Sequence, residues 1–240
     1  MNPSAAIKRI LRHVGIDIRR HVPGSSPGAQ LLAICKARSI DLVLDVGANA
    51  GQFAAELRTS GYTGSIVSFE PLTHAYEKLV RSSRNDDGWV VHRRCAIGSE
   101  RGSVEINVAA NSVSSSILPM LEAHRSAAPA SAYRGKETVP VETIDSVAPT
   151  YLHDARSVML KIDTQGYEWQ VLDGAVATLP RITAVLIEMS LVPLYEGQHL
   201  WLEIIARLEA MGFKTWSLQP GFVDPSTGRT LQVDGMFCRP

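Results

Sequence analysis

A short loop with two glycines is the feature that most constrains the fold of this chain. Residues 47–51 follow the apolar run Leu42–Val46 and precede a segment in which apolar residues recur at helical spacing. Glycine lets a backbone turn tightly and approach a ligand closely, because no Cβ fills the space. We therefore predict a strand over 42–46, a helix over 51–60 and a binding loop between them.

The alternation of strand and helix continues along most of the chain. Further strands are expected at 65–70, 89–97, 157–163 and 183–189, and further helices at 29–38, 71–83, 167–179 and 200–211. Two last runs, 214–218 and 230–238, are separated by turn-rich residues, as in a hairpin. Alternation of this kind is typical of an α/β fold, in which helices cover both faces of a largely parallel sheet.

One segment, residues 99–157, breaks this alternation. It holds strand-like runs at 102–109 and 138–144 and stretches of small and polar residues. We predict an insertion or lid over the sheet, within one domain of residues 29–240. A chain of 240 residues suits a single domain with an insertion.

Residues 1–28 are expected to form a basic amphipathic helix and a linker. Residues 1–21 hold five basic residues and one acid, while the rest of the chain holds 19 basic and 23 acidic residues. Two interpretations stay open for this helix. It packs on its own domain or on a second subunit of a homodimer, or it makes peripheral contact with a membrane surface.

The net charge of the whole chain is zero, which argues against a nucleic-acid partner. Three widely spaced cysteines fit neither a disulfide framework nor a zinc site. No apolar run approaches the roughly 18 residues of a membrane span, and no signal peptide is apparent. A cytoplasmic location is expected, with the inner membrane surface as an alternative.

Two acids frame the glycine loop. Glu70 ends the second strand, 23 residues after Gly47, where a carboxylate can accept hydrogen bonds from both hydroxyls of a ribose. Asp45 precedes the loop, which reads G-x-N-x-G through Asn49 and Gly51 rather than the G-x-G-x-x-G of dinucleotide sites. An acid beside a cradle with few phosphate-binding features favours S-adenosylmethionine over NAD.

With these residues in place, the chain resembles the FkbM family of S-adenosylmethionine-dependent methyltransferases over residues 29–240. The matching motifs are Asp45-Val-Gly-Ala-Asn-Ala-Gly51, Phe69-Glu-Pro71, Cys95-Ala-Ile-Gly98, Lys161-Ile-Asp-Thr-Gln-Gly-Tyr-Glu168, Val171-Leu-Asp-Gly-Ala175, Leu186-Ile-Glu188 and Val233-Asp-Gly-Met-Phe237. The resemblance implies a Rossmann-like, seven-stranded class I methyltransferase sheet of order 3-2-1-4-5-7-6 with the last strand antiparallel. It also implies O-methylation of a hydroxyl, and by analogy it places Cys95 and Ala96 beside the adenine.

Acids at the ends of the fourth and fifth strands are the candidates for catalysis. Asp163 ends the fourth strand and is the first candidate for a general base, or a ligand to the cofactor's amino group. Glu188 ends the fifth strand and His199 lies just beyond it; either could be a base, a substrate ligand or a structural group. Asp163 and Glu188 could chelate a divalent metal, but the family's usual K-I-D-V-E-G has Thr164 and Gln165 here, so a metal is not favoured.

Polar side chains of the insertion are candidates for binding the acceptor. Asn111, Ser114 and Ser115 offer amide and hydroxyl groups that suit a polyhydroxylated molecule. Tyr195 is placed to stack on a sugar ring.

The expected function is therefore S-adenosylmethionine-dependent O-methylation of a sugar, glycolipid or polyketide-type natural product. One alternative is an NAD-dependent oxidoreductase or epimerase on a related sheet. Another is a non-catalytic nucleoside-binding adaptor, for which Gln165 would be the mark.

Overall fold

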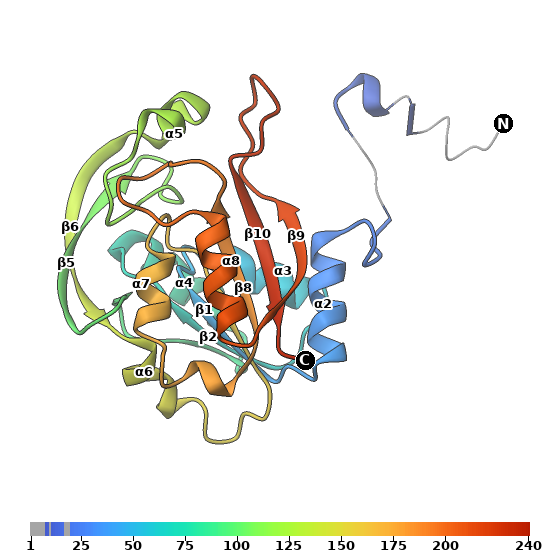
Figure 1. Ribbon diagram of the computed structural model, residues 1–240, viewed down its shortest axis with the longest axis vertical. Coiled ribbons are helices and arrows are strands. Elements are labelled where there is room, and N and C mark those ends of the chain that lie inside the picture. The colour runs from blue at the N-terminus through green and yellow to red at the C-terminus, as the bar shows by residue number, and fades with distance from the viewer. Residues whose placement is uncertain (1–7, 10, 17–19) are drawn as a thin grey trace.

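The computed structural model describes residues 8–9, 11–16 and 20–240. Its main sheet has seven strands in the order β3-β2-β1-β7-β8-β10-β9 (Figure 1). The strands are β1 (Leu42–Val46), β2 (Ser65–Phe69), β3 (Trp89–Val91), β7 (Val158–Ile162), β8 (Ile182–Ser190), β9 (Lys214–Pro220) and β10 (Gln232–Cys238). β10 runs antiparallel to its neighbours β8 and β9. The five strands β3, β2, β1, β7 and β8 pair in parallel. The predicted fold class and strand order are confirmed.

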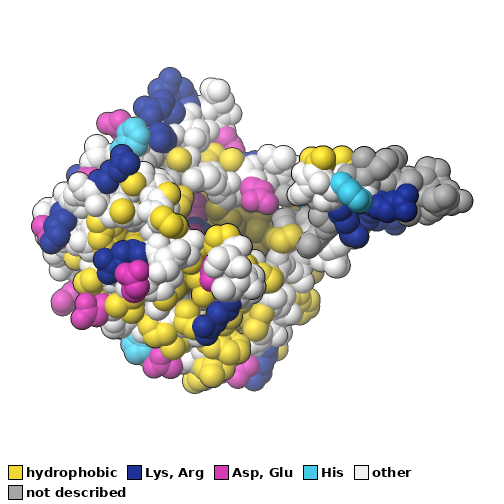
Figure 2. Space-filling model, turned by 90° about the horizontal axis from the view of Figure 1, so that it is seen from above, with side chains coloured by type: hydrophobic (Ala, Val, Ile, Leu, Met, Phe, Trp, Pro, Cys, Tyr) yellow, Lys and Arg dark blue, Asp and Glu magenta, His cyan; other side chains and the backbone are white. Residues whose placement is uncertain are grey.

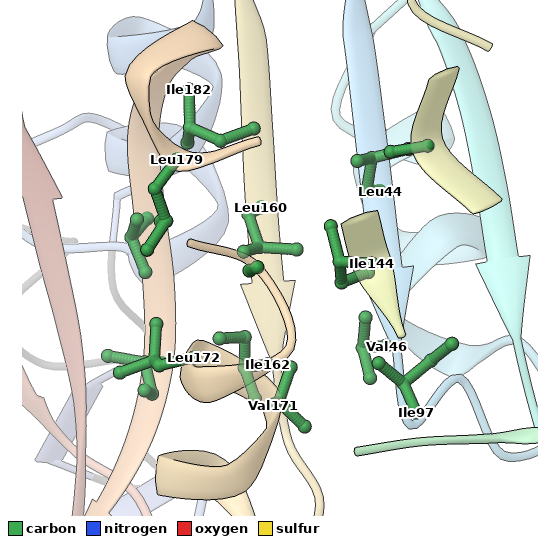
Figure 3. Packing of buried hydrophobic residues seen from close by; sticks show 14 of the residues in the cluster. Leu44, Val46, Ile97, Ile144, Leu160, Ile162, Val171, Leu172, Leu179 and Ile182 are labelled. Carbon is green, nitrogen blue, oxygen red and sulfur yellow. The ribbon is translucent and has the colours of Figure 1, made fainter. Parts of the chain in front are cut away.

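Helices cover both faces of this sheet because its central strands are apolar on both sides. The helices are α2 (Pro27–Ala37), α3 (Gln52–Thr59), α4 (Thr73–Ser83), α7 (Glu168–Asp173) and α8 (Trp201–Ala210). Leu44 and Leu160 pack in the cluster that α7 and α8 cover, and Figure 3 shows part of this cluster. Val43 and Met159 face the other way and pack against α2 and α3. This two-sided burial is typical of parallel sheets.

A second, three-stranded sheet takes two of its strands, β5 (Gly102–Ala109) and β6 (Tyr133–Glu142), from the segment predicted to be an insertion, and its third strand, β4 (Ala96–Ile97), lies just before that segment. Its order is β4-β6-β5. β5 has the predicted bounds, whereas β6 begins five residues before the predicted 138. β6 ends at Glu142 because Thr143 caps the short helix α6 (Ile144–Val147), where its side chain accepts a hydrogen bond from the amide of Ser146.

The predicted single strand over 89–97 is wrong, because its two halves join different sheets. β3 pairs with β2 in the main sheet, while β4 pairs with β6 in the small one. Between them, Arg93 and Arg94 form ion pairs with Glu142 and Glu137 of β6. These ion pairs hold the chain against the small sheet.

The predicted helix over 167–179 is also too long. α7 ends at Asp173, because Gly174 lies against the backbone of Gly98: a Cβ at Gly174 would stand 2.0 Å from the carbonyl oxygen of Gly98. The chain turns at this contact instead of continuing as a helix.

The predicted N-terminal helix lies only partly within the described residues. Residues 8–9 and 11–13 are helical, and residues 1–7, 10 and 17–19 of the prediction lie outside the described part. In the described part of the chain, no helix is long and apolar enough to span a membrane. Contact of residues 1–21 with a membrane surface or a second subunit stays a prediction.

Candidate functional site

A cavity of about 230 Å³ opens at the carboxyl ends of β1, β2 and β7. β1 lies between β2 and β7, so the strand order reverses here, and ligands of α/β sheets bind at such a point. The walls come from the loop after β1, the end of β2, the start of β4, the loop after β5 and the loop after β7. Figure 2 views the molecule from above and shows a recess floored by hydrophobic side chains, with charged side chains scattered around it.

The glycine loop forms one wall of this cavity. Gly47 has a φ of 77°, and a Cβ at this position would stand 1.8 Å from the backbone oxygen of Asp163. Asn49 also lines the cavity and also has a positive φ, of 47°. Gly51 does not line it; a Cβ there would stand 2.7 Å from the ring of Trp89, so this glycine lets α3 begin against the core. Gly47 thus lets the loop after β1 lie against the chain that follows β7, beside the cavity.

Glu70, directly after β2, lines the cavity beside the glycine loop, where a carboxylate was expected for the ribose. Its carboxylate accepts hydrogen bonds from the backbone N–H of Asn49 at 2.8 Å and of Leu72 at 2.9 Å. The side chain is buried, and burial is the main cause that raises the pKa of Glu70 to about 7. These two bonds fix a carboxylate at the edge of the cavity.

Asp45 does not line the cavity, although it was predicted to touch the cofactor. Its side chain is fully buried, where it accepts a hydrogen bond from the hydroxyl of Ser68 at 2.9 Å and lies 3.2 Å from Nζ of Lys161. Lys161 in turn donates to the backbone oxygen of Gly47 at 3.1 Å and lies 3.6 Å from Asp163. Asp45 therefore acts on the glycine loop through Lys161.

Lys161 is a site residue to which the sequence reasoning assigned no role. Burial lowers its pKa, but the carboxylates of Asp45 and Asp163 outweigh burial and raise the pKa above its ordinary value. Lys161 opens the matching motif Lys161–Glu168. Its ion pair, however, depends on the parallel register of β1 and β7, which places Asp45 beside Lys161.

Cys95 and Ala96, expected beside the adenine, lie in the cavity wall. Both residues are buried and line the cavity. Burial raises the pKa of the Cys95 thiol to about 12, so the side chain is a neutral, apolar surface at physiological pH.

Two of the three candidate catalytic residues lie in one cluster. Nε2 of Gln165 donates to Oδ1 of Asp163 at 2.8 Å and to Oε2 of Glu188 at 2.7 Å. Asp163 lines the cavity, and Glu188 lies one strand further along the sheet. Burial, followed by the charge of Asp163, raises the pKa of Glu188 well above its ordinary value.

His199 lies apart from this cluster. Its ring stacks on Trp169, with ring centroids 3.9 Å apart, and its Nδ1 lies 3.1 Å from Glu203 of α8. It does not line the cavity.

The predicted acceptor residues divide into one that lines the cavity and three that do not. Ser115 lines it, and its Oγ accepts from the amide of Ala109. Asn111 and Ser114 bond to each other behind the wall, with Nδ2 of Asn111 donating to Oγ of Ser114 at 3.0 Å. The predicted stacking of a sugar on Tyr195 is wrong, because its ring is fully buried beneath Ser114 and Gln165.

Neighbours of the predicted serines were missed. Ser112 lines the cavity and accepts a hydrogen bond from Nδ2 of Asn49 at 3.3 Å, and Ser116 lines it while donating to the backbone oxygen of Gln165 at 2.6 Å. The loop after β5 thus closes over the glycine loop. The Asn/Ser run marked this loop, but which serines face inward depends on its turns.

The described residues contain no group of three or more His, Cys, Asp or Glu side chains that could hold a metal ion. S-adenosylmethionine fits the cavity, because Glu70 presents a fixed carboxylate to it and the buried residues Cys95 and Ala96 line it.

Comparison with known proteins agrees with this geometry. A family model described as the methyltransferase FkbM domain matches residues 45–215. The hexuronic acid methyltransferase AglP of Haloferax volcanii is 24% identical over 168 residues, which are 66% of this chain and 59% of AglP. The chain therefore spans less than two thirds of the length of this relative.

Solved methyltransferase structures are also similar. TehB from Haemophilus influenzae gives a TM-score of 0.47 at 9% identity, over 88% of this chain and 62% of TehB. The S-adenosylmethionine-dependent methyltransferase SibL, in its apo form, gives a TM-score of 0.47 at 12% identity, over 89% of this chain and 55% of SibL.

Proposed function

The chain belongs to the FkbM family of methyltransferases, and from this premise we propose that it transfers a methyl group from S-adenosylmethionine to a hydroxyl of a sugar, glycolipid or polyketide-type molecule. The observation that carries the proposal is the fixed carboxylate of Glu70 beside the glycine loop in the wall of one cavity. A ribose in the cavity would meet this carboxylate, which two backbone N–H groups hold in place. The name of AglP, a hexuronic acid methyltransferase, supports a sugar as the acceptor.

The methyl donor is already activated, so the protein has little chemistry to supply. Bound S-adenosylmethionine supplies a methyl group on a sulfonium. When an oxygen nucleophile attacks this methyl group, the sulfur leaves as a neutral thioether. The protein must orient the acceptor and take its proton. Asp163 is placed for this, because it lines the cavity and its side chain keeps 37% of its surface exposed.

Lys161 and Gln165 both touch the carboxylate of Asp163. Lys161 lies 3.6 Å from Oδ2, and Gln165 donates to Oδ1. These two contacts hold the carboxylate in place in the cavity wall. In the proposed reaction the acceptor oxygen bonds to the methyl carbon, the carbon–sulfur bond breaks, and the hydroxyl proton passes to Asp163.

Methyl transfer is tested with isotopically labelled S-adenosylmethionine and oligosaccharides or glycolipids that contain hexuronic acids. We expect label in the acceptor, with the mass of one added methylene group. The label should survive mild alkali, because a methyl ether resists conditions that hydrolyse a methyl ester.

Asp163→Asn should lower kcat by about 100-fold with the donor affinity unchanged.

Two results would contradict the proposal. Alkali-labile label would show that a carboxylate, not a hydroxyl, is the acceptor. Binding of the donor without transfer to any sugar, glycolipid or cell extract would favour the non-catalytic adaptor.

A further inference from the structure

Gln165 stands between two carboxylates of different strands. Its amide nitrogen lies 2.8 Å from Oδ1 of Asp163 and 2.7 Å from Oε2 of Glu188. A glutamine amide carries two N–H donors, so each carboxylate receives one of them. The amide group thus joins the two acids as a bridging cation would.

The orientation of this amide is fixed from its other side. Oε1 of Gln165 accepts a hydrogen bond from the hydroxyl of Tyr195 at 2.8 Å, and Tyr195 is fully buried. The backbone of Gln165 has a φ of 54° and its carbonyl accepts from Ser116 at 2.6 Å. A non-glycine residue in this conformation is strained unless its surroundings hold it. Both contacts therefore direct the N–H groups toward the acids.

The acids have other polar neighbours but few cations. Nε2 of Gln232 donates to the same oxygen of Glu188 at 2.7 Å, and Lys161 lies 3.6 Å from Oδ2 of Asp163. The charges of Asp163 and Asp234 both disfavour ionisation of Glu188. The two carboxylates of Asp163 and Glu188 would attract a divalent cation if the space between them were free.

We propose that Gln165 is a positioning residue that takes the place of a bridging divalent cation, holding Asp163 and Glu188 ready for methyl transfer without a metal. The role in methyl transfer rests on the proposed function, whereas the replacement of the cation does not. Mg²⁺ and Ca²⁺ need oxygen ligands at about 2.0–2.6 Å, and an N–H group between the carboxylates blocks that approach.

Two variants of the full chain test the replacement, with Mn²⁺ as the probe and electron paramagnetic resonance as the readout. Gln165→Glu places a third carboxylate in the cluster and should bind Mn²⁺ at least about tenfold more tightly than the wild type. Gln165→Ala removes the amide and leaves both acids, so its Mn²⁺ affinity should lie between the two. Ala55→Glu adds a carboxylate on the exposed face of α3, which is not part of the cluster, and should bind no more Mn²⁺ than the wild type.

A purely structural role for Gln165 predicts no gain of metal binding in Gln165→Ala, to which no carboxylate is added, and that result would overturn the proposal. Tight Mn²⁺ binding by the wild type would also overturn it, because it would show that the amide turns its oxygen to a metal. Far-UV circular dichroism, measured on the same samples, reports whether each variant is folded. If the wild type binds no S-adenosylmethionine, the proposed function fails. The Mn²⁺ affinities still test whether the amide of Gln165 takes the place of a cation.

Discussion

Replacing Glu70 with glutamine should weaken S-adenosylmethionine binding by about 100-fold. In the wild type both carboxylate oxygens are held by backbone N–H groups, of Asn49 and Leu72, while the side chain borders the cavity. The variant places an NH₂ group against one of these N–H donors and removes the charge from the ribose contact. A hydrogen bond to a charged group is worth about 1.5–3 kcal/mol, and a 100-fold loss of affinity corresponds to about 2.7 kcal/mol, so the loss of one such bond gives an effect of this size.

Calorimetric titration of wild type and Glu70→Gln measures this loss. Glu77→Gln removes the same charge from the exposed face of α4 and should leave the affinity unchanged. Because burial raises the pKa of Glu70 to about 7, the affinity of the wild type should fall as the pH drops from about 8 to about 6. The variant should lack this dependence, and equal affinities of wild type and Glu70→Gln would remove Glu70 from the site.

Replacing Lys161 with methionine should destabilise the fold by about 3–5 kcal/mol. Nζ of Lys161 lies 3.2 Å from Asp45, and the exposed fractions of the two side chains are 8% and 0%. Removing one partner of a buried ion pair leaves the other charge without compensation in a medium of low polarity. The loss should appear as a lower midpoint in urea with an unchanged slope.

A second substitution tests the cause of this loss. Asp45→Asn combined with Lys161→Met removes the uncompensated charge, so the double variant should be more stable than Lys161→Met alone. Lys36→Met on α2 removes an exposed lysine and should change stability little. A double variant no more stable than the single one would contradict the ion-pair explanation.

The main sheet could be predicted because its signals are local. β1 and α3 follow from apolar periodicity, and the loop between them follows from two glycines. The break between β3 and β4 could not be predicted this way. It depends on ion pairs of Arg93 and Arg94 with acids of β6, more than 40 residues along the chain.

The site divides in the same way. Gly47, Asn49, Glu70 and Asp163 reach the cavity as predicted, because loops at the carboxyl ends of neighbouring parallel strands converge. Asp45 and Tyr195 do not, because burial decides their direction and their partners lie on other elements. In the sequence, Gln165 stands where the family usually has an acid. Only its contacts with Asp163, Glu188 and Tyr195 show what the amide does there.

The central claim is that the cavity beside Gly47 and Glu70 binds S-adenosylmethionine. Calorimetric titration of the wild-type chain with S-adenosylmethionine, and separately with NAD⁺, tests it most directly. We expect one site per chain for S-adenosylmethionine and no measurable heat with NAD⁺. Binding of NAD⁺ at this site, or no binding of S-adenosylmethionine, would contradict the account.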